Sequence, residues 1–171
     1  MSQPQERNVV LTGFMGTGKT EVGRAVAQAL GRRFVDMDEV LAQRLGMSVP
    51  EVFRRLGEPF FRAEESRLVR ELAGQRGLVI ATGGGALVNA ANRRAMAETS
   101  LLIRLNASPD ALWQRLSGTD GRPMLEAQDR QARMTELLRL REPAYQEIPH
   151  QVETSDLTIE QVAARVGQIV A

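Results

Sequence analysis

A glycine-rich segment carries the clearest chemical signal in the sequence. Residues 13–20, Gly-Phe-Met-Gly-Thr-Gly-Lys-Thr, match the pattern G-x-x-x-x-G-K-[ST] and stand between an apolar run and an amphipathic one. In that context the backbone N–H groups of the loop and of the following helix N-terminus surround phosphate oxygens. Lys19 supplies a compact positive charge for the β- and γ-phosphates, and the Thr20 hydroxyl can ligate Mg²⁺. The residues expected to contact a nucleotide are Gly13, Met15, Gly16, Thr17, Gly18, Lys19 and Thr20.

The alternative interpretation of this segment is an ordinary glycine-rich turn with a solvated lysine. One observation agrees with phosphate binding: of the 22 basic residues, 21 are arginine, and the only lysine is Lys19. A planar guanidinium would fit poorly where a point charge must reach two phosphates. The position of this lysine is therefore consistent with a phosphate-binding loop.

Two carboxylates follow the second apolar run of the chain. Asp36 and Asp38 stand at the C-terminal end of a strand predicted at residues 34–37, so strand alternation predicts that both point to one side. In open α/β sheets, ligands bind at that end of the strands. One carboxylate there is expected to hold Mg²⁺, directly or through water, and the other to orient or deprotonate an acceptor hydroxyl. The alternative is that one aspartate, such as Asp38, only caps the next helix.

Other features are ambiguous when each is taken alone. Residues 83–85 are glycines after a buried run, which let a ligand approach the backbone closely but also occur in plain turns. Residues 117–129 form the one long segment without a pattern, and we expect a mobile lid there. Within it, Arg122 would close onto the transferred phosphoryl group, or would be a surface charge. Spacing alone does not distinguish Arg62 and Arg141 from the other arginines.

These groups need a scaffold, and the hydrophobic pattern predicts an α/β fold. Apolar runs at residues 9–12, 34–37, 78–82, 101–105 and 151–154 alternate with amphipathic stretches, which is typical of a parallel sheet covered by helices. Helices are expected up to Gly31, over 48–56 with a capping box at Ser48 and Glu51, over 61–73, over 89–97, from Ser108, and from Thr158. We predict one domain over residues 1–171, with a polar tail at 1–8.

The composition excludes several classes of protein. With 22 basic and 21 acidic residues among 171, the net charge is +1, which gives no field to attract nucleic acid or a membrane surface. Cysteine is absent and histidine occurs once, so disulfides, thiolate metal sites and histidine clusters are excluded. No apolar run approaches the length of a membrane span, and the polar start lacks the features of a signal peptide. We expect a cytoplasmic protein and, by default, a monomer.

Taken together, these residues resemble the shikimate kinase family, from about Val9 to the last helix. The motifs that carry the resemblance are residues 13–20, Asp36-x-Asp38, Gly57-Glu58-x-x-Phe61-Arg62, residues 83–85, Arg122-Pro123 and Arg141-x-Pro143-x-Tyr145, in this order. The resemblance implies a three-layer P-loop kinase fold with a five-stranded parallel sheet. It also implies transfer of the γ-phosphoryl group of MgATP to the 3-hydroxyl of shikimate, giving shikimate 3-phosphate and ADP.

The same resemblance implies roles for individual residues. Lys19 and Thr20 would hold the nucleotide phosphates and Mg²⁺ with support from Asp36. Arg115 would lie against adenine, and Arg122 would reach the phosphates with the lid. The implied acceptor contacts are Asp38 at the hydroxyls, Arg62 and Arg141 at the carboxylate, Gly83, Gly84 and Gly85 through their backbone, Phe53 and Phe61 at the ring, and Glu65 behind Arg62.

Three other interpretations stay open. Another small-molecule P-loop kinase, for gluconate or a nucleoside monophosphate, would share the phosphate loop. A nucleotide-binding regulatory module could keep the loop and lose the acceptor site, and an inactive structural domain would make the position of the single lysine an accident. Within the family, an amino-substituted analogue of shikimate would present the same carboxylate.

Overall fold

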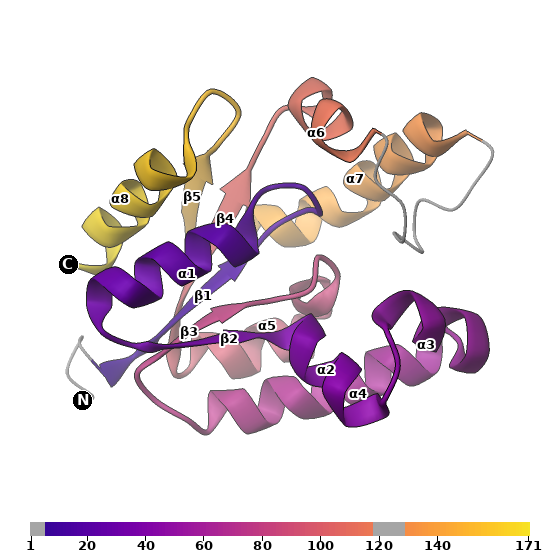
Figure 1. The fold of residues 1–171 in the computed structure, drawn as a ribbon, viewed down its shortest axis with the longest axis horizontal. Helices are drawn as coiled ribbons and strands as arrows, with labels where there is room; N and C mark the ends of the chain where they lie inside the picture. Colours follow the sequence, from indigo (N-terminus) through magenta and orange to yellow (C-terminus); the bar gives the residue numbers. More distant parts are fainter. Residues whose placement is uncertain (1–5, 118–128) are drawn as a thin grey trace.

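The computed structural model describes residues 6–117 and 129–171, which are built on a five-stranded parallel sheet (Figure 1). The strand order is β2-β3-β1-β4-β5, so the first strand of the chain lies at the centre. The strands are β1 (Asn8–Thr12), β2 (Arg33–Asp36), β3 (Leu78–Ala81), β4 (Ser100–Asn106) and β5 (His150–Glu153). Each boundary lies within one residue of the segment that the apolar runs predict. The predicted fold class is confirmed, because every neighbouring pair of strands is parallel.

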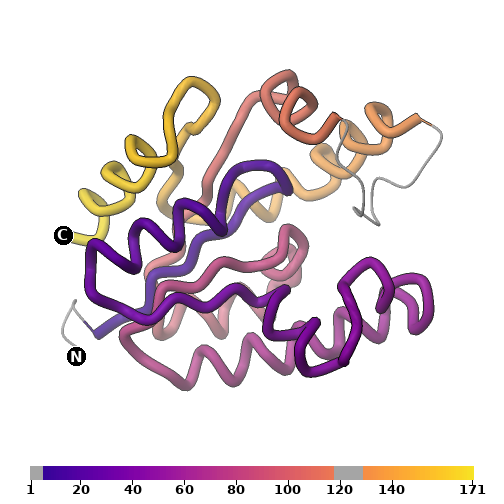
Figure 2. Tube along the Cα trace, viewed as in Figure 1, coloured from indigo at the N-terminus to yellow at the C-terminus, as the bar shows by residue number. Residues whose placement is uncertain are grey.

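Helices cover both faces of this sheet. They are α1 (Lys19–Leu30), α2 (Met37–Leu45), α3 (Val49–Leu56), α4 (Glu58–Ala73), α5 (Ala90–Ala97), α6 (Pro109–Leu116), α7 (Arg130–Gln146) and α8 (Ile159–Val170), with the 3-10 turn η2 (Ala86–Val88). None of the helices within residues 6–117 and 129–171 combines the length and apolar character that crossing a membrane requires. In Figure 2 the start of β1 and the end of α8 lie at one end of the molecule, away from the loop between β1 and α1.

The strands alternate between two hydrophobic cores. Val9 and Leu11 of β1 pack with α1 and α8 on one face, whereas Val10 packs with α2, α3, α4 and α5 on the other. This follows from the period of two in a strand, which sends successive side chains to opposite faces. A third cluster lies beyond the carboxyl ends of the strands and joins Phe14 to α6 and α7. That cluster fixes the loop after β1 against α7.

Most of the predicted helix boundaries are confirmed. The side chains of the N-cap residues each accept a hydrogen bond from a backbone N–H of the first turn; these residues are Ser48, Asn89, Ser108 and Thr158. Gly31 ends α1 in the left-handed region at a φ of 63°. The box expected at Ser48 forms only in part, because the Glu51 carboxylate pairs with Arg55 at 2.8 Å. The complete capping box lies at Thr158 and Gln161.

The expectation that Asp36 and Asp38 share one side of a strand was wrong. β2 ends at Asp36, and the buried Met37 already begins α2. The Asp36 carboxylate accepts hydrogen bonds from the backbone N–H groups of Asp38 and Glu39, so Asp36 is the helix cap, whereas we had considered that role for Asp38. An aspartate at this position satisfies donors that a helix N-terminus leaves unpaired, which ends the strand early.

Three helices differ from the prediction. α2 was expected only as the helix that an aspartate would cap, without bounds. α4 begins at Glu58 rather than at residue 61, because Gly57 (φ 85°) separates it from α3 and Pro59 suits a first turn. α7 was not predicted, since its buried face mixes the apolar Met134 and Leu137 with the charged Arg141.

Candidate active site

The loop between β1 and α1 is shaped by glycine backbone conformations. Gly13 has a φ of 141°, and a Cβ there would lie 2.3 Å from the carbonyl oxygen of Leu105, so a side chain does not fit. Gly18, at a φ of 88°, leads directly into α1. The Lys19 ammonium donates to the carbonyl oxygens of Gly13 and Phe14 at 2.9 and 3.0 Å, spanning the loop. The loop thus combines the N-terminus of α1 with the Lys19 ammonium, and both favour the binding of a phosphate group.

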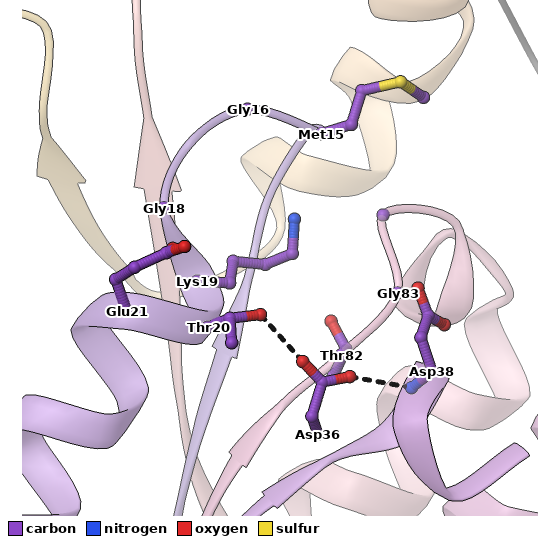
Figure 3. A pocket seen from close by; sticks show the side chains of 11 residues that line it. Met15, Gly16, Gly18, Lys19, Thr20, Glu21, Asp36, Asp38, Thr82 and Gly83 are labelled. Carbon is purple, nitrogen blue, oxygen red and sulfur yellow. Dashed lines mark hydrogen bonds between the residues drawn. The ribbon is translucent and has the colours of Figure 1, made fainter. Parts of the chain in front are cut away.

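This loop forms one wall of a cavity of about 310 Å³ (Figure 3). The β2–α2 junction and the end of β3 form the rest of it. The lining residues are Met15, Gly16, Gly18, Lys19, Thr20, Glu21, Asp36, Asp38, Thr82, Gly83 and Gly84. Gly13 and Thr17 are not among them: the Thr17 side chain is buried and donates back to the Phe14 carbonyl at 2.8 Å. The cavity therefore brings the phosphate loop, both aspartates and the glycine turn to one place.

Thr20 and Asp36 form the part of the cavity that suits a metal ion. The Thr20 hydroxyl lies 2.7 Å from Asp36 Oδ2 and donates to it, so its lone pairs stay available (Figure 3). Among residues 6–117 and 129–171 no group of three acidic or histidine side chains gathers as a closed metal cage. Mg²⁺ commonly takes one or two protein oxygens and completes its shell with phosphates and water. These residues therefore fit Mg²⁺ bound together with a nucleotide.

Arg62 lies on the far side of the glycine turn, held by acidic and aromatic neighbours. Its Nη1 donates to Glu65 Oε1 at 2.8 Å, as expected, and its Nε donates to Glu58 at 3.3 Å. The guanidinium lies 5.9 Å from the ring centre of Phe53 and 5.5 Å from that of Phe61. The two rings are 4.8 Å apart. This packing fixes a cation beside an apolar wall. Burial lowers the pKa of Arg62, but the contacts with Glu65 and Glu58 outweigh burial and raise the pKa above its ordinary value.

Glu65 and Asp38 converge on Gly83. A Cβ on Gly83 would lie 2.9 Å from Asp38 Oδ1 and 3.1 Å from Glu65 Oε2, so both oxygens face the turn. Glu65 is 1% exposed, and burial raises its pKa even though Arg62 opposes that shift. Its Oε2 has no hydrogen-bond partner among the described residues. An unpaired buried oxygen is costly, which indicates a position meant for a bound polar group.

Arg141 reaches the same turn from α7. Its guanidinium lies 5.5 Å from the ring centre of Phe14, and a Cβ on Gly84 would lie 3.1 Å from its Nη1. Arg141 is 6% exposed, and Nη1 has no hydrogen-bond partner within residues 6–117 and 129–171. A Cβ on Gly85 would lie 2.6 Å from the Arg62 guanidinium. The structure thus brings two guanidinium groups against one glycine turn, an arrangement that can bind a carboxylate.

Arg115, expected against adenine, contacts the phosphate loop and the segment that precedes α8. Its guanidinium donates to the carbonyl oxygens of Gly16 and Thr154 at 3.1 and 3.0 Å, and to the Thr154 hydroxyl at 3.2 Å. It therefore connects α6, the phosphate loop and the segment before α8. Arg122 and the rest of residues 118–128 lie outside the described residues. Thr82 and Glu21 line the cavity without having been predicted; the position of Thr82, between a buried strand and the glycines, is the signal that could have found it.

Known proteins resemble this chain closely. A family model described as shikimate kinase matches residues 15–171. A shikimate kinase from Geobacter sulfurreducens is 40% identical over 171 residues, covering 99% of this chain and 94% of the relative. One from Caldanaerobacter subterraneus subsp. tengcongensis is 42% identical over 160 residues, covering 94% of each.

A solved structure agrees with these matches. The shikimate kinase from Acinetobacter baumannii in complex with shikimate has a TM-score of 0.91 to this chain at 33% identity. The likeness covers 96% of this chain and 92% of that one, so it extends over the sheet, the phosphate loop and the helices that carry both arginines. The chain therefore belongs to the shikimate kinase family.

Proposed function

We propose that this chain transfers the γ-phosphoryl group of ATP to the 3-hydroxyl of shikimate. The observation that carries the proposal is the placement of Arg62 and Arg141 on one glycine turn, at the edge of the cavity that the phosphate loop lines. Shikimate is a small carboxylic acid with ring hydroxyls, so a guanidinium pair beside an apolar wall and a carboxylate matches its groups. Family membership supports the same substrate pair.

On the nucleotide side, we propose that the loop amides and Lys19 hold the β- and γ-phosphates. The Lys19 ammonium now lies on two carbonyl oxygens of the loop and can exchange them for phosphate oxygens. Thr20 and Asp36 would hold Mg²⁺, which when bound neutralises charge on the transferring phosphoryl group. Asp36 orients Thr20 by accepting its hydroxyl proton, and it also fixes the start of α2, which carries Asp38.

On the acceptor side, we propose that Arg62 and Arg141 bind the carboxylate while Asp38 receives the 3-hydroxyl. Glu65 would keep Arg62 in place, Phe53 and Phe61 would contact the ring, and the backbone of residues 83–85 would complete the site. The hydroxyl oxygen attacks Pγ as the bond to the β–γ bridging oxygen breaks, its proton passes to Asp38, and ADP leaves. Most of the catalysis in such a transfer is orientation and charge stabilisation. Since all of these groups come from one chain, we propose a monomer, which size-exclusion chromatography tests.

The test is ADP release by the purified protein with MgATP and one acceptor at a time. The acceptors are shikimate, an amino-substituted shikimate, gluconate, nucleoside monophosphates and buffer alone. Gluconate is the demanding comparison, because it also carries a carboxylate that an arginine pair can bind. We expect strong release with shikimate and little with gluconate or without an acceptor. Release with gluconate alone would contradict the acceptor assignment and leave the phosphate-loop assignment standing. ATP binding without release for any acceptor would favour a regulatory module.

A further inference from the structure

Tyr145 lies beneath the acceptor site and has no role in the proposed function. It ends the Arg141-x-Pro143-x-Tyr145 motif, one helical turn after Arg141 on α7, and its side chain is fully buried. Residues four apart lie on the same face of a helix, so both side chains approach the carboxyl ends of the strands together. A buried tyrosine hydroxyl requires a hydrogen-bond partner, and the identity of that partner decides what the residue can do.

That partner is the backbone of the glycine turn. The Tyr145 hydroxyl donates to the carbonyl oxygen of Gly84 at 2.5 Å. This carbonyl and the N–H of Gly85 belong to one planar trans peptide, so they point in opposite directions. By drawing the carbonyl toward α7, Tyr145 directs the Gly85 N–H away from α7. The orientation of a backbone donor beside Arg62 is therefore set by a side chain that lies outside the cavity.

Among the described residues, local hydrogen bonds within the turn do not hold the Gly84 carbonyl. The carbonyl oxygens of Gly83 and Gly85 accept local hydrogen bonds from Ala86 and Val88, whereas that of Gly84 is held from α7. Three consecutive glycines lack the side chains that would restrict their backbone, so an external contact matters more here than in an ordinary turn. The same peptide touches Arg141, whose Nη1 would lie 3.1 Å from a Cβ on Gly84.

The tyrosine ring is itself fixed from behind. The Arg104 guanidinium lies 4.9 Å from its ring centre and pairs with both oxygens of Glu142 at 2.9 and 2.7 Å. Arg104 is 4% exposed, and a desolvated cation over an aromatic face is a favourable contact. Burial also raises the pKa of Tyr145, so its hydroxyl stays protonated and remains a donor near neutral pH.

We propose that Tyr145 is a positioning residue for the acceptor. Its hydroxyl holds the Gly84–Gly85 peptide, against which the Arg141 guanidinium packs, in the orientation that receives the acceptor carboxylate. Arg104 and Glu142 support the ring. The inference rests on the proposed function, because it takes shikimate as the acceptor, so its test needs one measurement that does not depend on any substrate.

The substitution is Tyr145→Phe, which keeps the ring and removes only the hydroxyl. Hydrogen exchange of the ligand-free protein, followed by mass spectrometry, should show about tenfold faster exchange in peptides covering residues 83–88, the change expected from one lost hydrogen bond. The matched control is Thr135→Val, which removes one hydroxyl, donated to the carbonyl oxygen of Gln131, from the exposed side of the same helix. It should leave exchange at residues 83–88 unchanged. Equal exchange in the wild type and Tyr145→Phe would overturn the proposal.

Steady-state kinetics give the second measurement. Tyr145→Phe should raise the KM for shikimate about tenfold and leave the KM for ATP unchanged, since the phosphate loop is held by other contacts. Glu142→Gln, which weakens the support behind the ring, should produce a smaller rise in the same constant. Equal changes in both KM values, or a lower unfolding temperature with neither changed, would overturn the proposal. If the wild type shows no shikimate-dependent turnover, the proposed function fails, and the exchange result alone decides the role of Tyr145.

Discussion

The phosphate loop and the acceptor side meet in one cavity but are built in different ways. The loop is one run of eight residues, 13–20, whose proposed binding groups are backbone amides, a hydroxyl and a single ammonium. The acceptor side collects Asp38, Arg62, Glu65 and Arg141 from α2, α4 and α7, around the glycines that follow β3. One half therefore depends on local backbone conformation, and the other depends on long-range packing.

The two halves also differ in how they carry charge. The acceptor side buries Glu65 and Arg141 almost completely, and its Arg62–Glu65 pair is only partly exposed. Removing one member of a buried charge pair leaves the other without compensation, which destabilises the fold. Amides in a loop carry no such dependence. We therefore expect substitutions in the loop to change activity alone, and substitutions on the acceptor side to change both activity and stability.

The largest effect is expected for Lys19→Ala. Without the ammonium, the transferring phosphoryl group loses one of the cations that stabilise its charge, so kcat should fall on the order of 10³-fold. The unfolding free energy should change by no more than about 1 kcal/mol, because the hydrogen bonds to the carbonyl oxygens of Gly13 and Phe14 lie at a partly exposed site. Coupled ADP release and urea unfolding measure the two quantities.

Arg24→Ala is the matched control for Lys19→Ala. Arg24 lies on the same helix and pairs with Glu39 at the surface, away from the cavity. It should keep normal turnover. Near-normal turnover of Lys19→Ala would instead remove this residue from the mechanism, and an unfolded variant would contradict the local character that we assign to the loop.

The next effect in size is expected for Asp38→Asn. The amide keeps the shape of the side chain but loses the charge that receives the hydroxyl proton, so kcat should fall on the order of 10²-fold. Glu39→Gln is the neighbouring control, since the Glu39 carboxylate is exposed and pairs with Arg24. The ratio of the two kcat values, measured at saturating ATP and shikimate, is the test. A ratio near one would leave Asp38 as a binding residue only.

Arg141→Ala should mainly weaken acceptor binding. Hydrogen bonds to a charged group contribute about 1.5–3 kcal/mol, so the KM for shikimate should rise roughly 10- to 100-fold while the KM for ATP stays the same. Stability should also fall, because Arg141 lies close to the buried Glu65. Arg139→Ala, two residues earlier on an exposed face, removes only a pair with Glu136 and serves as the control. Equal shifts in both KM values would contradict an acceptor role for Arg141.

The same contrast explains how much could be predicted from the sequence. The loop was identified from consecutive residues, because a glycine pattern with a lysine and a threonine is a local property of the chain. The sheet was equally accessible, since buried parallel strands are continuous apolar runs such as those ending at Thr12 and Ala81. Arg62 and Arg141 could not be distinguished among 21 arginines by spacing, and only family resemblance indicated them.

The misses have a common physical origin. Asp36 caps α2 because its carboxylate accepts hydrogen bonds from backbone N–H groups that would not be available in a continuing strand. Strand alternation does not predict this competition between a helix cap and a strand. α7 escaped prediction because its inner face is partly ionic, with Arg141 among its buried residues. Tyr145 stood in a recognised motif, yet its partner, Gly84, is 61 residues away in the sequence. Contacts between residues so far apart in the sequence depend on the order of the strands in the sheet, which a single sequence does not reveal.

The smallest effect is a pH dependence of stability at Glu65. Burial raises the pKa of this carboxyl above its ordinary value of 4.5. The folded state therefore retains a proton that the unfolded state has released, so the unfolding free energy falls as pH rises from about 4.5 through the folded pKa. Glu65→Gln cannot ionise and lacks this contribution. The difference between wild type and Glu65→Gln should decline in that window, by no more than about 1.4 kcal/mol per pH unit, the limit for one proton.

That difference is measured by urea unfolding of the wild type and Glu65→Gln side by side at about five pH values between pH 4 and pH 8. Glu142→Gln gives a control of opposite sign, because hydrogen bonds from Arg104 lower the pKa of Glu142. Its stabilising contribution is present above the ordinary pKa and is lost as pH falls, so the corresponding difference should grow with pH. If the Glu65 difference stays flat, the carboxyl titrates alike in the folded and unfolded states. Arg62 would then fully offset the cost of burying the Glu65 charge, and the acceptor side would lack the uncompensated burial that separates it from the phosphate loop.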